Sequence, residues 1–210
     1  MAWKRRDLLK SGLLLGGAAA VGVKFLRPAE ASTSCLRPPG ALPEADFLAT
    51  CIRCGRCIDA CPNRAITRFT VTNAQPFSMK PGRGDAGTPA IFPRQQACNL
   101  CAGSQGDELL CTAACPTGAL RVVPRTAEGI QSRVSMGRAT LDTNLCYSHN
   151  GGSCGVCVRA CPFEGKALKA GIFERPLLDA RYCVGCGLCE RSCIRYPQAI
   201  SVVPDSRRAV

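Results

Sequence analysis

Four short segments of the chain repeat the same arrangement of small and apolar residues. Each segment lies a few residues after a cysteine, and the four pairs are Ala65-Ile66, Ala119-Leu120, Ala167-Leu168 and Ala199-Ile200. From the first pair onward, residues 65–72 (AITRFTVT) alternate in polarity and are rich in β-branched side chains, which predicts a strand. We therefore expect an internal repeat in which a short strand covers each unit.

A continuous apolar run occupies residues 13–23. The charged segment before it, residues 4–10 (KRRDLLK), resembles the twin-arginine export motif, and residues 29–31 form an A-x-A cleavage sequence before Ser32. The run is too short and too rich in Gly and Ala for a transmembrane helix, which needs about 20 apolar residues. The sequence therefore predicts a twin-arginine signal segment at residues 1–31 and export to the periplasm. The alternatives are a basic N-terminal helix and an uncleaved anchor.

Two further segments have no regular pattern. Residues 32–48 are rich in Pro and Ala, and we expect a lead-in that wraps onto the surface of the domain. The lead-in contains Cys35, for which we expect a free thiol, with lipid attachment as the alternative. Residues 75–93 are rich in Pro and Gly and predict a long irregular connection. A docking role suits this connection better than phosphate binding, because it lacks the Lys-Ser/Thr ending of a P-loop.

Cysteine is the unusual feature of the composition. The chain has 17 cysteines in 210 residues and only 5% aromatic residues, a content typical of disulfide scaffolds and metal proteins. All but Cys35 fall into four motifs, of which the second and third are more widely spaced. The motifs are Cys51, Cys54, Cys57, Cys61; Cys98, Cys101, Cys111, Cys115; Cys146, Cys154, Cys157, Cys161; and Cys183, Cys186, Cys189, Cys193.

The first and fourth motifs have the spacing C-x2-C-x2-C-x3-C, the bacterial ferredoxin pattern for 4Fe-4S cubes. In that pattern the fourth cysteine binds the cube of another motif, so we expect all sixteen cysteines to be ligands of four 4Fe-4S clusters. Glycines beside them would let the backbone approach sulfur at positive φ, namely Gly55, Gly155, Gly185 and Gly187.

Zinc sites and disulfides are the alternatives for these motifs, but neither explains a 2-2-3 run of cysteines. The single histidine, His149, cannot supply the pair of histidines that a Rieske centre requires. We expect this histidine to be a solvated loop residue.

The net charge of +12 would by itself suggest nucleic acid or a membrane surface. Without residues 1–31 the chain keeps 21 basic and 13 acidic residues, a net charge of +8. Four oxidised cubes with their thiolates would contribute about −8. We therefore interpret the basic excess as compensation for anionic clusters, and we expect no nucleic-acid partner.

The whole chain resembles the NapG/MauM family of ferredoxin-type iron–sulfur proteins. The resemblance rests on the twin-arginine start, on the two widened motifs, and on the segments GTPAIFPR, MGRATLDTNLC and CIRYPQAISVVP. It implies a periplasmic electron carrier with four 4Fe-4S clusters. The NapG branch works with a polytopic membrane partner, NapH, as a quinol dehydrogenase that feeds periplasmic nitrate reductase. The MauM branch accompanies methylamine oxidation, and the motifs do not separate the two branches.

By similarity to related four-cluster subunits, the resemblance implies that the two outer motifs pair and the two inner motifs pair. Cys193 would complete the cube of the first motif and Cys61 that of the fourth. Cys161 would complete the cube of the second motif and Cys115 that of the third.

The implied fold is α+β and loop-rich, with two intertwined bacterial-ferredoxin-like modules that each hold two 4Fe-4S clusters. The four-cluster domain would span residues 49–210. Its outer motifs would occupy 51–72 and 180–204, and its inner motifs 94–125 and 138–172.

No general base, nucleophile or flavin motif is visible, so we expect no catalytic site in this chain alone. The resemblance implies a component of a quinol dehydrogenase complex, which relays single electrons from a membrane quinol-oxidising partner (NapH-like) to a periplasmic redox protein. The chain would associate with the membrane through that partner or through an uncleaved signal. The alternatives are the iron–sulfur subunit of a molybdopterin oxidoreductase and a maturation or scaffold protein.

Overall fold

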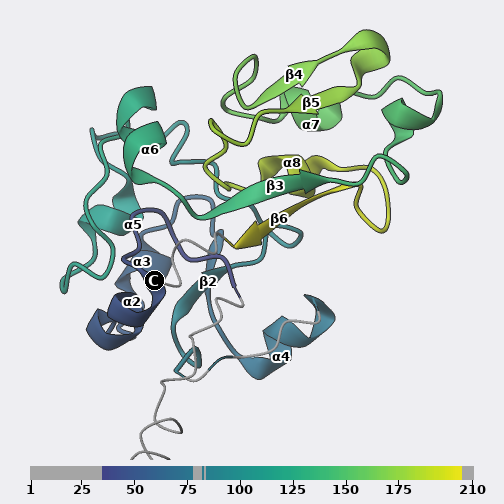
Figure 1. Ribbon diagram of the computed structural model, residues 1–210. Coiled ribbons are helices and arrows are strands. Elements are labelled where there is room, and N and C mark those ends of the chain that lie inside the picture. Colours follow the sequence, from purple (N-terminus) through teal and green to yellow (C-terminus); the bar gives the residue numbers. More distant parts are fainter. Residues whose placement is uncertain (1–34, 78–81, 83, 205–210) are drawn as a thin grey trace, which may run out of the picture. The chain divides into compact units, whose positions relative to one another are not determined.

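Short helices and paired strands alternate along the chain, as Figure 1 shows for a computed structural model. The structure describes residues 35–77, 82 and 84–204. The predicted signal segment, residues 1–31, lies outside these residues. Among the described residues, no helix is both long enough and apolar enough to span a membrane.

In the described part of the chain, the helices have at most seven residues each. The α-helices are α2 (Glu44–Thr50), α3 (Arg56–Asp59), α4 (Val71–Ala74), α5 (Leu110–Ala113), α6 (Ala127–Arg133), α7 (Val156–Arg159) and α8 (Leu188–Ser192). The 3-10 helices are η1 (Gln75–Phe77), η2 (Tyr147–Asn150) and η3 (Ile172–Glu174).

Six strands form three two-stranded antiparallel sheets in the described part of the chain. The pairs are β1 (Ile66–Arg68) with β2 (Pro89–Ile91), β3 (Gly137–Leu141) with β6 (Ile200–Pro204), and β4 (Leu168–Ala170) with β5 (Pro176–Leu178). Short helices with small separate sheets make an α+β fold, as expected.

The strand predicted at residues 65–72 is only partly correct. β1 ends at Arg68, and helix α4 begins at Val71. The side chain of Thr70 accepts a hydrogen bond from the N–H of Asn73, while the Asn73 side chain accepts one from the N–H of Thr70. This reciprocal capping starts a helix despite the β-branched sequence.

The connection predicted at residues 75–93 contains more structure than expected. It includes η1 and strand β2, whose Ile91 pairs with Ile66 of β1. The strand was not predicted because, in the sequence GTPAIFP, only the three residues AIF separate two prolines.

The lead-in is buried only where its described part begins: residues 41–48 are mostly half-buried or exposed, so the surface position predicted for residues 32–48 is wrong only for the earlier part. Residues 35–40 are all buried. Main-chain hydrogen bonds join this segment to two other parts of the fold: Ile91 N donates to Leu36 O, and Arg121 N donates to Gly40 O.

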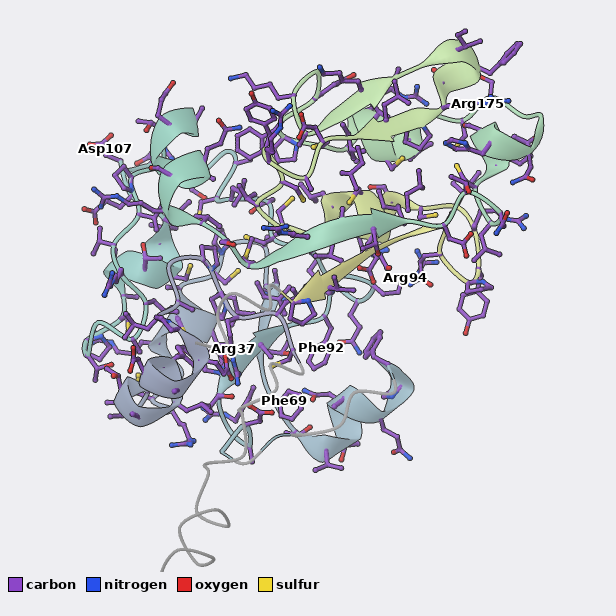
Figure 2. The ribbon with its side chains drawn as sticks, viewed as in Figure 1. Arg37, Phe69, Phe92, Arg94, Asp107 and Arg175 are labelled. Carbon is purple, nitrogen blue, oxygen red and sulfur yellow. The ribbon has the colours of Figure 1, made fainter. Side chains whose placement is uncertain are left out.

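Cys35 is 2% exposed and packs with Phe69 and Phe92, whose rings stack with centroids 6.2 Å apart (Figure 2). A buried thiol does not suit lipid attachment.

A buried ion network fixes the lead-in to its neighbours. The guanidinium of Arg37 contacts Glu44 of α2 at 2.5 Å and Asp85 at 2.6 Å, and it donates to Thr88 Oγ1 at 2.7 Å. It also lies over the ring of Phe47, with Cζ 4.9 Å from the ring centroid. Burial by itself lowers the pKa of Arg37, but the hydrogen bond to Glu44 and the nearby charges raise the pKa above its ordinary value.

The four repeated apolar pairs all lie in the core, as expected from the sequence. Their eight residues are between 1% and 4% exposed. Three pairs begin or precede the strands β1, β4 and β6, whereas Leu120 forms only an isolated bridge with Ala41. The covering role is therefore common to all four repeats, and three of them form a strand.

Candidate metal centres

The sixteen motif cysteines gather around four hollows, each lined by four of them. Site 1 contains Cys51, Cys54, Cys57 and Cys115; site 2 contains Cys61, Cys98, Cys101 and Cys111; site 3 contains Cys146, Cys154, Cys157 and Cys193; site 4 contains Cys161, Cys183, Cys186 and Cys189. Each hollow therefore takes three cysteines from one motif and the fourth from another, as the ferredoxin spacing predicts.

The expected pairing of outer with outer and inner with inner motifs is wrong. Cys193 lies in the site of the third motif, and Cys115 lies in the site of the first. The reason is helix packing: α3, between Cys54 and Cys61, contacts α5 of the second motif, and α7 contacts α8 (Figure 1). Neighbouring motifs exchange their fourth cysteines, so the chain has a first module with sites 1 and 2 and a second module with sites 3 and 4. The two modules follow one another and are not intertwined as predicted.

Site 1 is the most open of the four. Its hollow has a volume of about 340 Å³. All seventeen cysteines lie in the described part of the chain, and among them only Cys54 is exposed. Burial, together with the neighbouring thiols of Cys51, Cys115 and Cys54, raises the pKa of Cys57 to about 12. Burial also raises the pKa of Cys115, but N–H groups of Leu120, Thr117 and Gly118 outweigh burial and hold this pKa below its usual value.

Site 2 is more enclosed, with a hollow of about 280 Å³ lined by Leu100 and Leu109. Burial raises the pKa values of Cys98 and Cys111 well above the ordinary range, and the neighbouring thiols add to the effect. The thiols of Cys98 and Cys111 therefore stay protonated without a cation. Metal binding must displace their protons.

Site 3 has a hollow of about 360 Å³ bordered by η2, which carries Tyr147 and Ser148. Burial raises the pKa of Cys157 to about 11, helped by the thiols of Cys146, Cys193 and Cys154. His149 is half-buried in η2 with its Nε2 atom enclosed, so the prediction of a solvated loop histidine is wrong.

Site 4 lies under the β3–β6 sheet, and its hollow measures about 340 Å³. Burial raises the pKa of Cys186 to about 12. Gly185 has φ +75°, and a Cβ atom there would overlap the backbone of Gly137 in β3. Only glycine allows this cysteine loop to lie against the strand.

Main-chain N–H groups point at cysteine sulfur in three of the sites. Ala65 N donates to Cys61 Sγ at 3.3 Å, Leu120 N to Cys115 Sγ at 3.4 Å, and Ala139 N to Cys183 Sγ at 3.4 Å. Two of these donors belong to the repeated apolar pairs. The pairs therefore cover the sites and also supply hydrogen bonds that stabilise thiolate.

Arginine side chains surround the sites and donate to carbonyl groups of the cysteine segments. Arg125 donates to Cys101 O at 3.2 Å, Arg94 to Cys193 O at 3.0 Å, and Arg175 to Ser148 O at 3.2 Å (Figure 2). Arg53 and Arg68 donate to carbonyls around site 1 in the same way. The sequence predicted compensating positive charge but did not identify these residues, because their positions have no fixed spacing from the cysteines.

The sites are wider than a site for a single ion. Among the described residues, no three Cys, His, Asp or Glu side chains converge closely enough to hold one metal ion. In a 4Fe-4S cube each thiolate bonds a different iron, so the four sulfur atoms stand further apart than the ligands of one zinc ion. Each hollow is lined by four cysteines, the number of protein ligands that a 4Fe-4S cube takes.

Two models of iron–sulfur domains match the chain. Residues 50–119 match the 4Fe-4S dicluster domain, and residues 153–164 match the 4Fe-4S binding domain. The first match covers sites 1 and 2, in agreement with the module formed by the first two motifs.

Curated relatives are similar over nearly the whole length. The methylamine utilization ferredoxin-type protein MauM of Methylobacillus flagellatus is 34% identical over 96% of this chain and 84% of its own. The ferredoxin-type protein NapG of Escherichia coli is 34% identical over the same shares of the two chains. The chain belongs to the NapG/MauM family of ferredoxin-type iron–sulfur proteins. Its cysteine sites are therefore those of a NapG/MauM-family protein that binds 4Fe-4S clusters.

A solved structure of low sequence identity is also similar to the chain. It is a chain of the formate dehydrogenase–heterodisulfide reductase–formylmethanofuran dehydrogenase complex from Methanospirillum hungatei. The two chains are 21% identical, over 75% of this chain and 49% of that chain, with a TM-score of 0.26. No part of the fold is inferred from this match.

Proposed function

We propose that this protein relays single electrons through four 4Fe-4S clusters, one at each site, between two partners that meet it at sites 1 and 3. Each cluster supplies one-electron redox chemistry when bound. The chain's own residues hold the clusters, enclose sites 2 and 4, and place positive charge beside sites 1, 2 and 3.

The order in which the sites neighbour one another carries this proposal. Cys111 of site 2 interacts electrostatically with Cys57 of site 1, and Cys189 of site 4 interacts with Cys157 of site 3. Between the modules, Cys98 of site 2 interacts with Cys186 of site 4, and Cys98 N donates to Cys186 O at 2.9 Å. We therefore order the four sites in a series: site 1, site 2, site 4, site 3.

The two ends of this series are also its accessible sites. Ile52, 63% exposed, lines the hollow of site 1, and Tyr147 and Ile194, 49% and 64% exposed, line that of site 3. Among the described residues, the hollows of sites 2 and 4 have no such exposed large apolar side chain. Exposed apolar side chains beside a redox group suit contact with a partner.

The partners are inferred from the family. The names of the relatives refer to methylamine utilization and to the ferredoxin-type protein NapG. We expect the donor to be a polytopic membrane quinol-oxidising protein, NapH-like, and the acceptor to be a periplasmic redox protein in nitrate reduction or methylamine utilisation. The proposal includes export to the periplasm by the twin-arginine route.

The first test is the iron and acid-labile sulfide content of the protein purified without oxygen, together with EPR of its reduced form. The proposal predicts about sixteen iron and sixteen sulfide per chain. Reduction with a quinol and the isolated membrane partner should produce the EPR signals of the cubes. About four zinc ions and no sulfide would overturn the relay.

A further inference from the structure

Site 3 contains a buried hydroxyl without a partner. Ser148 is 1% exposed, lines the hollow between Cys146 and Cys154, and its Oγ atom makes no hydrogen bond. A buried hydroxyl normally has a partner because leaving it unsatisfied is unfavourable. Because Ser148 lines the hollow of site 3, an acceptor inside that hollow could receive its hydrogen bond.

The other described side chains with an enclosed, unsatisfied atom are placed differently. Thr67, Gln131 and His149 are among them, and none of these residues lines a cysteine hollow. Ser148 is therefore the residue whose unsatisfied donor coincides with a proposed cluster.

The position of Ser148 is distinctive among the four motifs. Two residues after the first cysteine of each motif, the chain has Arg53, Leu100, Ser148 and Gly185 in turn. Only the third motif has a hydroxyl there. Site 3 is thus chemically different from sites 2 and 4, whose described lining residues include no hydroxyl.

The loop that carries Ser148 is held in place on both sides. Arg175 donates from its Nε to Ser148 O at 3.2 Å, and Asn150 Nδ2 donates to Cys146 O at 2.8 Å. These bonds fix the main chain, so the hydroxyl can move only by rotation of the Ser148 side chain. A fixed donor at the rim of a cluster can affect its reduction potential.

From these contacts we infer that Ser148 is a positioning residue that donates an O–H hydrogen bond to sulfur of the cluster at site 3 and raises its reduction potential. The inference rests on the proposed function, since it requires a 4Fe-4S cluster at site 3. A cube gains negative charge on reduction, and a donor at its sulfur stabilises the reduced form more than the oxidised form. Site 3 is therefore tuned above the potential that its thiolates alone would give.

The test compares Ser148→Ala with Ser153→Ala in the full chain, using redox titration followed by EPR. Ser153 is exposed in the same loop, and its hydroxyl already donates to Glu174 Oε2 at 2.9 Å. The signal of site 3 is assigned as the one lost in Cys193→Ala. S148A should lower the midpoint potential of that signal by about 59 mV, a tenfold change in the ratio of reduced to oxidised protein. S153A should leave it unchanged.

Each outcome decides the inference. An S148A protein that keeps all its iron and sulfide and has an unchanged site 3 potential overturns it, with the relay itself intact. If S148A does not load site 3, Ser148→Thr is measured, and loading with the original potential supports the hydroxyl. Failure of both variants to load means that the shape of serine matters, and this overturns the inference. A wild-type chain without a cluster at site 3 instead refutes the proposed function.

Discussion

Among the described residues, Arg37 is the cationic side chain that is most fully buried. It is 1% exposed. The side chains of its carboxylate partners are also almost fully buried, with exposures of 2% for Glu44 and 4% for Asp85. Buried charges are tolerated only when they remain paired. This one residue connects the lead-in, helix α2 and the segment before β2.

Replacing Arg37 should therefore be costly. Arg37→Met removes the buried cation that contacts both carboxylates, and breaking a buried ion pair typically costs about 3–5 kcal/mol. For a chain of this size that corresponds to a fall in Tm of about 6–20 °C, measured by thermal unfolding of the loaded protein. The matched control is Arg181→Met, because the Arg181–Asp179 pair is exposed at the surface. Equal Tm values for the two variants would contradict the structural role of Arg37.

Gly185 gives a second prediction at this scale. Gly185→Ala puts a side chain at φ +75° against the backbone of Gly137, with a cost of about 1–3 kcal/mol from backbone strain and more from the overlap. The expected result is loss of the cluster at site 4 alone, seen as about four fewer iron atoms per chain. Gly118→Ala serves as control, since its φ is also positive and no atom lies within 4 Å of an added Cβ. Full iron content in G185A would refute the prediction.

Single residues were predictable from the sequence where spacing specifies them. The sixteen cysteines and the positive φ at Gly55, Gly155, Gly185 and Gly187 follow from the ferredoxin pattern, and the structure agrees on the glycines. Arg37, Arg94 and Ser148 were not predictable. Their importance comes from partners far away in the chain, such as Asp85 for Arg37, and no local pattern encodes those contacts.

At the scale of elements, the packing of α3 on α5 and of α7 on α8 decides which cysteines share a site. These helices have four or five residues each, and α3, α7 and α8 begin after a glycine in the left-handed region. Each of these helices contains the third cysteine of its motif, and the fourth cysteine follows just after the helix and lines a different hollow. The exchange of the fourth cysteine therefore follows from the local fold of each motif.

This packing predicts which cluster each substitution removes. Cys115→Ala should damage the cluster at site 1 and leave site 2 loaded, although Cys115 belongs to the second motif. Cys193→Ala should damage site 3 and leave site 1 intact. EPR of the reduced variants, with iron analysis, distinguishes these results from the outer–outer pairing. Loss of site 1 in C193A would mean that the helices pair differently from the structure.

The sequence predicted the existence of the repeats better than their pairing. Cysteine spacing is a local property, and it specifies that a fourth ligand comes from another motif without saying which. The choice depends on which helices contact each other, which is a property of the tertiary fold. The strand β2 was missed for a related reason, because its partner β1 lies more than twenty residues earlier in the chain.

On the scale of the whole molecule, the clusters take the place of a large apolar core. Seven of the sixteen motif cysteines count among the buried core residues, and the sheets of the described chain have two strands each. Isolated two-stranded sheets are only marginally stable in water. Metal binding can supply the missing folding free energy.

Removal of iron should therefore unfold the described domain. Treatment with a chelator and ferricyanide without oxygen should abolish cooperative thermal unfolding and make the chain sensitive to protease, as measured by circular dichroism and limited proteolysis. Reconstitution with iron and sulfide should restore both properties. A metal-free protein that still unfolds cooperatively would argue that the apolar core is sufficient by itself.

The buried lead-in also bears on the maturation of the protein. A peptidase that cuts before Ser32 would have only three residues, 32–34, between its cleavage point and the buried segment that begins at Cys35. Proteolysis needs accessible chain around the bond that is cut. Under the proposed twin-arginine export, folding around Arg37 and removal of the leader would make opposing demands on the same few residues, and their order would determine whether the mature protein is free or tethered.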